Sequence, residues 1–269
     1  MKRIGKIPAV TLSLIVITCI VMVIMRLFLP LSNTAEQAIF MGGYYKPLVL
    51  AGEWWRMITV LLVHGSFMHL LCNCLSLLSL GTVLESMGGS LRFAVVFLMS
   101  VLGGSLFVFV ADNTSVAVGM SAGIYGLFAW YLHLVYATKM YQNPMMMNSI
   151  LRTVIINLLI NFLPGVSWTA HLGGFLFGFV TSAILIPGFD ETKRKHWLLA
   201  GVLFLGGMGY LSTTRYEMGN TPIYLGTDIN LIETYQKMGL DQYGEQLARK
   251  LDDVYGTDVL ETYIGSEYE

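Results

Sequence analysis

Two residues with the chemistry of a nucleophile and a base lie at the starts of two long apolar segments. Ser121 is the centre of a GMSAG sequence at residues 119–123, and His171 is the second residue of AHLGG at residues 170–174. Polar groups are costly to place in hydrocarbon, so those found there are candidates for function. A serine hydroxyl becomes nucleophilic when a base takes its proton, and imidazole titrates near neutral pH. The pair therefore predicts a Ser121 nucleophile with His171 as its general base.

A third segment supplies groups that can stabilise an oxyanion. His69 and Asn73 are four residues apart, so on a helix they share one face and can direct two N–H groups at one point. The backbone N–H of Ser121 can add a donor to the negative oxygen of a tetrahedral intermediate. No carboxylate lies near His171 in sequence on the same side of the membrane. We therefore expect a Ser/His dyad, with Tyr125, one turn after Ser121, stacked on the imidazole.

Each of these residues also has a structural explanation. A single serine in an apolar helix can bond back to a carbonyl of the preceding turn, and a single buried histidine can be structural. The structural explanation is weaker for Ser121 and His171 taken together, because both are expected at the same depth in the membrane and near the His69 and Asn73 pair. A metal site would need His64, His69, Cys72 and Cys74 together. Because Cys72 and Cys74 are two residues apart and point to different faces of a helix, we expect no metal and no other cofactor.

The composition indicates that helices in a membrane position these groups. The chain has 269 residues, of which 55% are hydrophobic and 12% charged, whereas soluble domains carry about a quarter charged residues. Apolar stretches of about 20 residues recur, and in lipid a helix satisfies its own backbone polar groups. We predict an all-α polytopic membrane protein with seven spans, at about residues 8–29, 67–86, 91–111, 120–139, 149–163, 169–187 and 197–213.

The distribution of charge separates the C-terminal end from the rest. Residues 1–213 contain 12 of the 16 Lys and Arg residues and 6 of the 17 Asp and Glu residues, whereas residues 214–269 contain 4 and 11. We expect a membrane core at 1–190, an additional transmembrane helix at 191–213 and an acidic soluble tail at 214–269. Helical spacing over 231–251 suggests a helical hairpin in this tail, and we favour a solvated appendage over a substrate-recruiting module. The net charge of −1 gives no reason to expect a nucleic-acid partner.

The basic residues orient the chain. Positive charge marks the cytoplasmic side of a membrane protein, and it gathers at the N-terminus in Lys2, Arg3 and Lys6. We expect a multi-pass protein of the plasma membrane with a cytoplasmic N-terminus and an extracytoplasmic tail, which places every candidate catalytic group in the outer leaflet. Three basic residues on the predicted outer side do not fit this orientation: Arg26, Lys46 and Arg56.

Other residues are expected to support the fold. Glu85 ends the second apolar segment, far from Ser121, and is interpreted as a structural hydrogen-bonding group. Glu53 and Arg56 flank two tryptophans and are expected to brace the connection at 30–66, which should contain short interfacial helices. Pro144 is expected to begin an apolar loop.

Small residues predict where two spans touch. Gly174 and Gly178 follow His171, and Gly119, Gly123 and Gly126 surround or follow Ser121 at similar spacing. Smooth helix faces of this kind allow backbones to approach closely. We expect the fourth and sixth spans to be in contact, which would bring the hydroxyl within reach of the imidazole.

Together these motifs resemble the rhomboid intramembrane serine proteases over roughly residues 50–190. The matching features are EWWR at 53–56, His64-x4-His69-x3-Asn73, Gly81-x3-Glu85, Gly119-x-Ser121-x-Gly123 with Tyr125, and AHxxGxxxG from Ala170 to Gly178. The resemblance implies a six-helix core with Ser121 as nucleophile and His171 as base. It also implies an oxyanion hole of His69, Asn73 and the Ser121 amide, with His64, Tyr125, Gly119 and Gly174 in supporting positions. Ala122 departs from the glycine of many members, and the seventh span resembles the subgroup with six helices plus one.

The expected function is therefore cleavage of transmembrane protein substrates within the lipid bilayer, in or near the outer leaflet. The first alternative is a non-catalytic relative that binds and routes membrane proteins, which would be expected to lack Ser121 or His171. A transporter or channel would be expected to carry charged residues at mid-membrane, and Glu85 is the only acidic residue embedded in the core spans.

Overall fold

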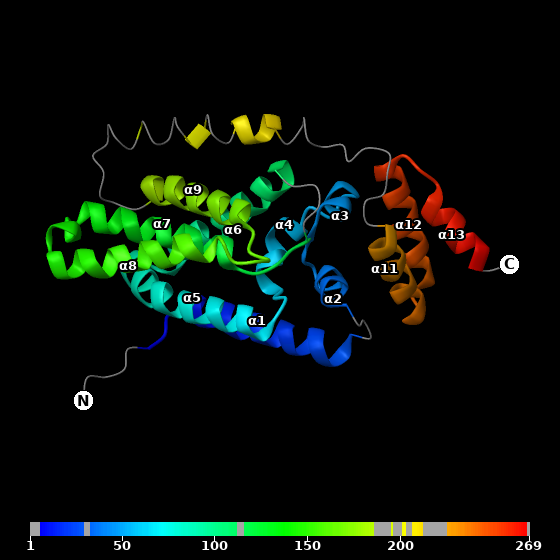
Figure 1. Cartoon of the computed structure of the whole chain (residues 1–269), viewed down its shortest axis with the longest axis horizontal. Coiled ribbons are helices and arrows are strands. Elements are labelled where there is room, and N and C mark those ends of the chain that lie inside the picture. Colours follow the sequence, from blue (N-terminus) through cyan, green and yellow to red (C-terminus); the bar gives the residue numbers. More distant parts are fainter. Residues whose placement is uncertain are drawn as a thin grey trace.

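The computed structural model describes residues 6–29, 33–111, 116–185, 195, 201–202, 206–211 and 225–267. Within these residues it is a helical bundle with a separate group of C-terminal helices at one end (Figure 1). The labelled helices are α1 (Ala9–Phe28), α2 (Thr34–Phe40), α3 (Lys46–Leu50), α4 (Arg56–Thr59), α5 (Phe67–Gly88), α6 (Ser90–Ala111), α7 (Ser121–Ala137), α8 (Pro144–Ile160), α9 (Trp168–Leu185), α11 (Leu225–Lys237), α12 (Asp241–Tyr255) and α13 (Val259–Glu267). The structure also contains two 3-10 helices, η1 (Val60–Leu62) and η2 (Met140–Gln142), and two short strands, β1 (Tyr44–Tyr45) and β2 (Val116–Ala117).

Helices α6, α7 and α9 form the centre of the bundle because small residues let their backbones meet. A methyl group at Gly174 would collide with the backbone of Ala122, and one at Gly178 would collide with Gly126. On α6, a methyl group at Gly104 would lie 2.5 Å from the Ala122 side chain. The predicted contact between the fourth and sixth spans is confirmed.

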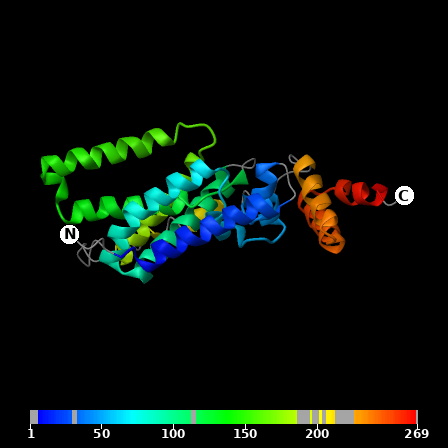
Figure 2. The same cartoon turned by 90° about the horizontal axis from the view of Figure 1, so that it is seen from below.

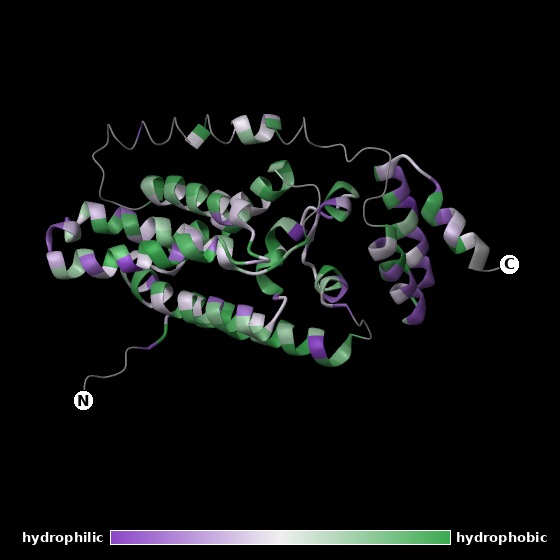
Figure 3. Cartoon of the chain, in the orientation of Figure 1, coloured by the Kyte–Doolittle hydropathy of each residue, from purple (hydrophilic) through white to green (hydrophobic). Residues whose placement is uncertain are grey.

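The predicted membrane spans correspond to helices. Among the described residues, four helices are long and apolar enough to cross a membrane, namely α1, α5, α6 and α9. Helices α7 and α8 have 17 residues each and occupy the fourth and fifth predicted spans. Hydrophobic residues predominate along these helices, whereas hydrophilic residues are more frequent in the C-terminal helices (Figure 3). Most of the seventh predicted span lies outside the described residues, although 201–202 and 206–211 are helical.

Helix α8 begins earlier than the sequence suggested, so the loop expected at Pro144 is wrong. The side chain of Asn143 accepts hydrogen bonds from the backbone N–H groups of Met145 at 3.0 Å and Met146 at 3.3 Å. Pro144 takes the first helical position, where its missing N–H leaves nothing unpaired. Figure 2 shows α8 standing to one side of the other core helices, and Ile150 is its only buried residue.

The connection between α1 and α5 contains short helices, as predicted. Helices α2, α3, α4 and η1 all lie within it. Strand β1 pairs antiparallel with β2, with Tyr44 opposite Ala117 and Tyr45 opposite Val116. Because β2 ends two residues before Gly119, this pairing holds the segment leading to Ser121 against the connection.

The C-terminal helices pack on this same connection, so the expectation of a solvated appendage is wrong. Helices α11 and α12 form the hairpin expected over 231–251, and α13 follows them. Ile39, Tyr45 and Leu48 of the connection share one buried apolar cluster with residues of the three helices, namely Leu231, Ile232, Leu247, Ala248, Leu251, Tyr255, Leu260 and Ile264. The acidic composition of this segment suggested that it stays in water. Burial of its apolar side chains against the connection is favourable and accounts for the packing that is observed.

A carboxylate lies inside this interface. Asp228 of α11 is fully buried, and its two oxygens accept hydrogen bonds from the hydroxyls of Tyr45 and Tyr255, each at 2.8 Å. Burial disfavours the charged form and raises the pKa of Asp228 to about 6, although the two tyrosine hydroxyls oppose the shift. The interface therefore contains a group whose charge depends on pH in the mildly acidic range.

Candidate active site

The loop before Ser121 lies against the side chains predicted to bind an oxyanion. Gly119 has φ +105°, a backbone conformation that favours glycine, and its N–H donates to the carbonyl of Val60 at 3.0 Å. A methyl group at Gly119 would lie 2.8 Å from His69 Nε2 and 3.3 Å from Asn73 Nδ2. The structure thus brings His69 and Asn73 to the segment that carries Ser121.

The local structure of α5 explains how these two side chains are presented. Ser66 caps the helix by accepting a hydrogen bond from the His69 N–H at 3.1 Å. His69 and Asn73 then follow on one face. The Nδ2 group of Asn73 is buried and has no hydrogen-bond partner among the described residues. A buried donor without a partner costs free energy, so this amide is ready to donate to a bound oxygen.

His64 lies beside this cluster. Its ring meets that of His69 edge to face, with centroids 5.1 Å apart. The side chain is fully buried, and neither ring nitrogen has a hydrogen-bond partner in the described part of the chain. Burial, with a smaller contribution from the neighbouring His69, lowers the pKa of His64 to about 3. His64 is therefore neutral near physiological pH and adds no charge to the site.

Ser121 and His171 lie on the two helices that touch most closely. Ser121 immediately precedes Ala122, whose backbone meets Gly174, one turn after His171. Within the described residues, however, no hydrogen bond joins the Ser121 hydroxyl to the His171 ring. The contact between the alcohol and the imidazole therefore stays a prediction. Catalytic hydrogen bonds are often long in unliganded enzymes and shorten when a substrate binds.

Tyr125 and His171 are stacked, as expected. Their ring centroids are 4.0 Å apart and the ring planes differ by 13°. The Tyr125 hydroxyl donates to the backbone carbonyl of Asn157 on α8 at 2.6 Å. The stack therefore fixes the plane of the imidazole and is itself tied to α8.

The structure adds a residue that the sequence reasoning missed. Asn161, at the C-terminal end of α8, lies with its Oδ1 atom 2.7 Å from His171 Nδ1. The available signal was the pair Asn157 and Asn161, which places two amides one turn apart on an otherwise apolar segment. The sequence does not show which helix that pair faces.

A cavity opens beside the imidazole, between α7, α8 and α9. Its volume is about 700 Å³. Aromatic and aliphatic side chains form most of its wall, and the polar groups come from Tyr125, Asn157, Asn161 and His171. Sites with a largely apolar wall and a few convergent polar groups are typical of ligand binding.

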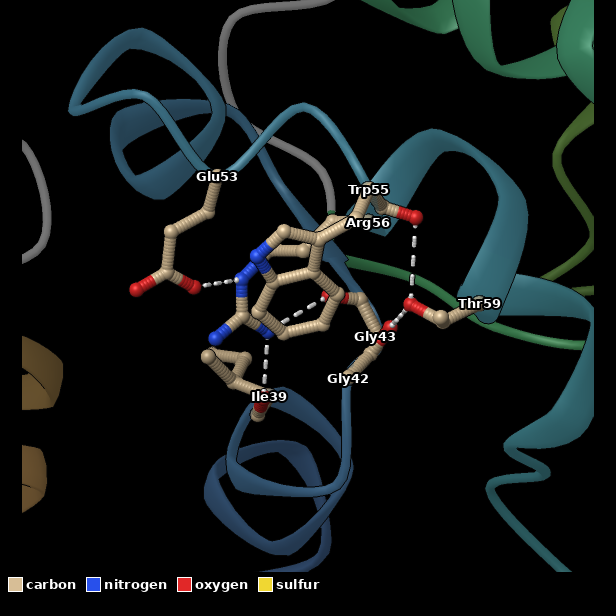
Figure 4. Close-up of polar contacts among 7 residues, drawn as sticks. All are labelled: Ile39, Gly42, Gly43, Glu53, Trp55, Arg56 and Thr59. Atoms are coloured by element: carbon tan, nitrogen blue, oxygen red, sulfur yellow. Dashed lines mark hydrogen bonds and ion pairs between the residues drawn. The ribbon is translucent and has the colours of Figure 1, made fainter.

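Glu53 and Arg56 brace the connection outside the bundle, as shown in Figure 4. Arg56 is buried, and its Nε donates to Glu53 at 2.6 Å while Nη1 donates to the carbonyls of Ile39 at 2.5 Å and Gly43 at 3.0 Å. A guanidinium group donates in several directions at once, so one side chain of α4 is joined to α2 and to the turn that precedes β1. Neither residue contacts Ser121 or His171 among the described interactions, and we assign both to the fold.

Glu85 lies at the opposite end of α5 and holds the start of α1. Its carboxylate accepts from the N–H groups of Val10 and Thr11, from the Thr11 hydroxyl and from the Ser90 hydroxyl. Pro8, the N-cap residue of α1, has no side-chain cap. Glu85 therefore caps α1 from a neighbouring helix.

The side chains considered for a metal do not form a site in the described structure. Cys72 is exposed and Cys74 is half-buried. Among the described residues, no group of three His, Cys, Asp or Glu side chains is arranged to hold a metal ion.

Comparison with known proteins leads to one family. A family model of the rhomboid domain matches residues 51–188. RHOMBOID-like proteins 5 and 2 of Arabidopsis thaliana are 35% and 33% identical to the chain, over 58% and 66% of it and 56% and 60% of their own lengths. Rhomboid protease GluP of Bacillus subtilis (strain 168) is 31% identical over 67% of the chain and 36% of its own length. The chain thus spans less than two thirds of the length of each of these relatives.

Proposed function

We propose, since the chain belongs to the rhomboid family, that this multi-pass membrane protein is an intramembrane serine protease with Ser121 as nucleophile and His171 as general base. The observation that carries the proposal is the meeting of three distant segments. His69 and Asn73 lie against the Gly119 loop, and α9 touches α7 next to Ser121. A nucleophile, a base and oxyanion donors on one site are the requirements for acyl transfer.

The proposed reaction has two steps. The Ser121 oxygen attacks the carbonyl carbon of a peptide bond while its proton passes to Nε2 of His171. The C–N bond then breaks, and the imidazolium returns this proton to the leaving amine. His171 next removes a proton from a water molecule that attacks the resulting ester. Cleavage of the ester releases the carboxylic acid and restores the Ser121 hydroxyl.

The oxyanion is proposed to lie near Gly119. His69 and the unpartnered Asn73 Nδ2 supply side-chain donors there, and the Ser121 N–H supplies a backbone donor. Donors already in place at a dry site stabilise developing charge strongly, and losing one typically costs about 100- to 1000-fold in kcat.

The substrates are proposed to be transmembrane protein segments cleaved in or near the outer leaflet. A helical peptide bond is shielded by its own hydrogen bonds, so the segment must unwind locally, and small residues at the cleavage site favour this. We also propose a plasma-membrane location with a cytoplasmic N-terminus and the C-terminal helices outside, on the basis of the basic residues at the N-terminus.

The proposal is tested with purified protein in lipid vesicles and a single-span reporter substrate. Ser121→Ala should abolish cleavage and labelling by a fluorophosphonate probe while leaving the melting temperature unchanged. Ser100→Ala is the matched control, because the Ser100 hydroxyl bonds only to the carbonyl of Val96 in its own helix, and it should retain both activities. Cleavage that persists in Ser121→Ala refutes the assignment. A wild-type protein that binds the reporter without cleaving it or reacting with the probe would instead be the non-catalytic relative.

A further inference from the structure

The amide of Asn161 makes a closed set of hydrogen bonds around the imidazole. Its Nδ2 group donates to the backbone carbonyl of Asn157 at 2.8 Å and to the Tyr125 hydroxyl at 3.0 Å. The Tyr125 hydroxyl donates onward to the same Asn157 carbonyl at 2.6 Å. The remaining atom, Oδ1, faces His171 Nδ1 at 2.7 Å.

This pattern determines which nitrogen of His171 carries the proton. The Asn157 carbonyl can only accept, so the amide atom facing it must be the NH2 group of Asn161. Oδ1 of Asn161 therefore faces His171, and because a carbonyl oxygen cannot donate, Nδ1 must carry the hydrogen. The other ring nitrogen, Nε2, is then left with its lone pair. That is the atom a general base needs for the Ser121 proton.

The same contacts tie this tautomer to the position of α8. Helix α8 packs little of its own surface, since Ile150 is its only buried residue, and much of its inner side borders the cavity of about 700 Å³. Its C-terminal end is held to the site by the Tyr125–Asn157 and Asn161–His171 hydrogen bonds. Displacing that end by more than about 1 Å would break both bonds, because hydrogen bonds weaken steeply with distance and angle.

We infer that Asn161 is a positioning residue that holds His171 in the Nδ1–H tautomer, so that the general base is set only while the end of α8 is seated against Tyr125. The inference rests on the proposed function for its catalytic consequence. The hydrogen-bond geometry of His171 stands without it. An amide carbonyl does here what the buried aspartate does in a Ser-His-Asp triad, but without a charge, so its loss should cost less than the roughly 10⁴-fold that a wrong tautomer costs there.

The test compares Asn161→Ala with Thr153→Val. Thr153 is the matched control because it lies on the same helix, its hydroxyl donates to the Ser149 carbonyl at 3.0 Å, and it is not among the residues that line the cavity. For cleavage of the reporter, Asn161→Ala should lower kcat roughly 10- to 100-fold with KM changed less than about twofold, as for other residues that act by orienting a ligand or base. Thr153→Val should stay within about twofold of wild type. Asn161→Asp keeps an acceptor for Nδ1–H and should recover part of the lost kcat.

A second measurement is independent of catalysis. Protein with ¹⁵N-labelled histidine, in which the His171 signals are identified by their loss in His171→Gln, should show the Nδ1–H tautomer in wild type and Thr153→Val and a change of tautomer in Asn161→Ala. A His171 that carries its proton on Nε2 in wild type, or a tautomer and kcat that are unchanged in Asn161→Ala, overturns the inference. If wild type shows no Ser121-dependent cleavage, the proposed function fails, and the tautomer spectra still decide whether Asn161 positions the ring.

Discussion

The hydrogen bonds of Glu85 allow a quantitative prediction about stability. In Glu85, Oε1 accepts from the Val10 N–H at 3.0 Å and the Ser90 hydroxyl at 2.6 Å, and Oε2 accepts from the Thr11 N–H and hydroxyl, both at 2.8 Å. Glu85→Gln replaces one acceptor oxygen with an NH2 group. The hydroxyl on that side can rotate to accept, but the backbone N–H cannot, so one buried donor loses its partner.

The expected cost follows from these contacts. An unpaired buried N–H costs about 1–3 kcal/mol, and a hydrogen bond to a charged acceptor is worth about 1 kcal/mol more than one to a neutral acceptor. The carboxylate also lies at the N-terminus of α1, where negative charge contributes about 0.3–1 kcal/mol. Relief of the desolvated charge offsets part of the sum. We expect Glu85→Gln to lower the free energy of unfolding by about 2–4 kcal/mol.

The assay is reversible unfolding in mixed micelles, followed by circular dichroism, with a double-mutant cycle as control. Thr11→Val and Glu85→Gln each disrupt the hydrogen bond between the Thr11 hydroxyl and the Glu85 carboxylate. The change in unfolding free energy of the double variant should therefore differ from the sum of the two single changes by about 1 kcal/mol. Thr18 is equally buried on the same helix, but its hydroxyl bonds to the carbonyls of Leu14 and Ile15. Thr18→Val should therefore add to Glu85→Gln within about 0.5 kcal/mol. A Glu85→Gln protein within about 0.5 kcal/mol of wild type would show that the cap contributes nothing and refute the reasoning.

Two further predictions concern the helix contact and the C-terminal helices. Gly178→Ala should lower the free energy of unfolding by about 1–3 kcal/mol and reduce reporter cleavage, because the added methyl group would meet Gly126. Gly207→Ala, which has open space around it, is the control and should change neither quantity. Because burial raises the pKa of Asp228 from 3.8 to about 6, the folded state binds this proton more tightly. Protonation of Asp228 therefore stabilises the folded state, fully below about pH 4. This contribution to the free energy of unfolding, up to about 3 kcal/mol, is lost as the pH rises through about 6. The stability difference between wild type and Asp228→Asn should therefore change across pH 4–6, and a difference that is constant over this range would refute the assignment.

Much of the membrane core was predictable because lipid imposes simple rules. A span must be a long apolar helix, and glycines at regular spacing mark where helices meet. These rules located the helices that carry Ser121 and His171 and predicted their contact at Gly174 and Gly178. Because a span must be helical, the four-residue spacing of His69 and Asn73 also placed this pair on one helix face.

The parts that sequence did not predict depend on which surfaces meet in three dimensions. Asn161 looks like a residue at the end of a span until α8 is placed beside His171. The acidic tail looks solvated until Tyr45 is seen to share an apolar cluster with its helices. In both cases the interaction joins two residues that are far apart in the sequence. The spacing of apolar residues around either one does not indicate the other. The early start of α8 is different, because the Asn143-Pro144 sequence is a recognisable cap that the apolar methionines after it obscured.

The basic residues that conflicted with the predicted orientation have a common structural explanation. Arg26 donates to the Gly65 carbonyl at 2.6 Å, Arg56 donates to two backbone carbonyls of the same connection, and the Lys46 ammonium lies 4.8 Å from the centre of the Phe109 ring. The partners of the two arginines belong to the connection between α1 and α5, and the partner of Lys46 belongs to α6. Translocating a cation is unfavourable, but carbonyl and aromatic partners offset that cost once the connection has folded. Basic residues that have partners within the folded protein therefore carry less weight in predicting orientation than Lys2, Arg3 and Lys6, for which the sequence offers no such role.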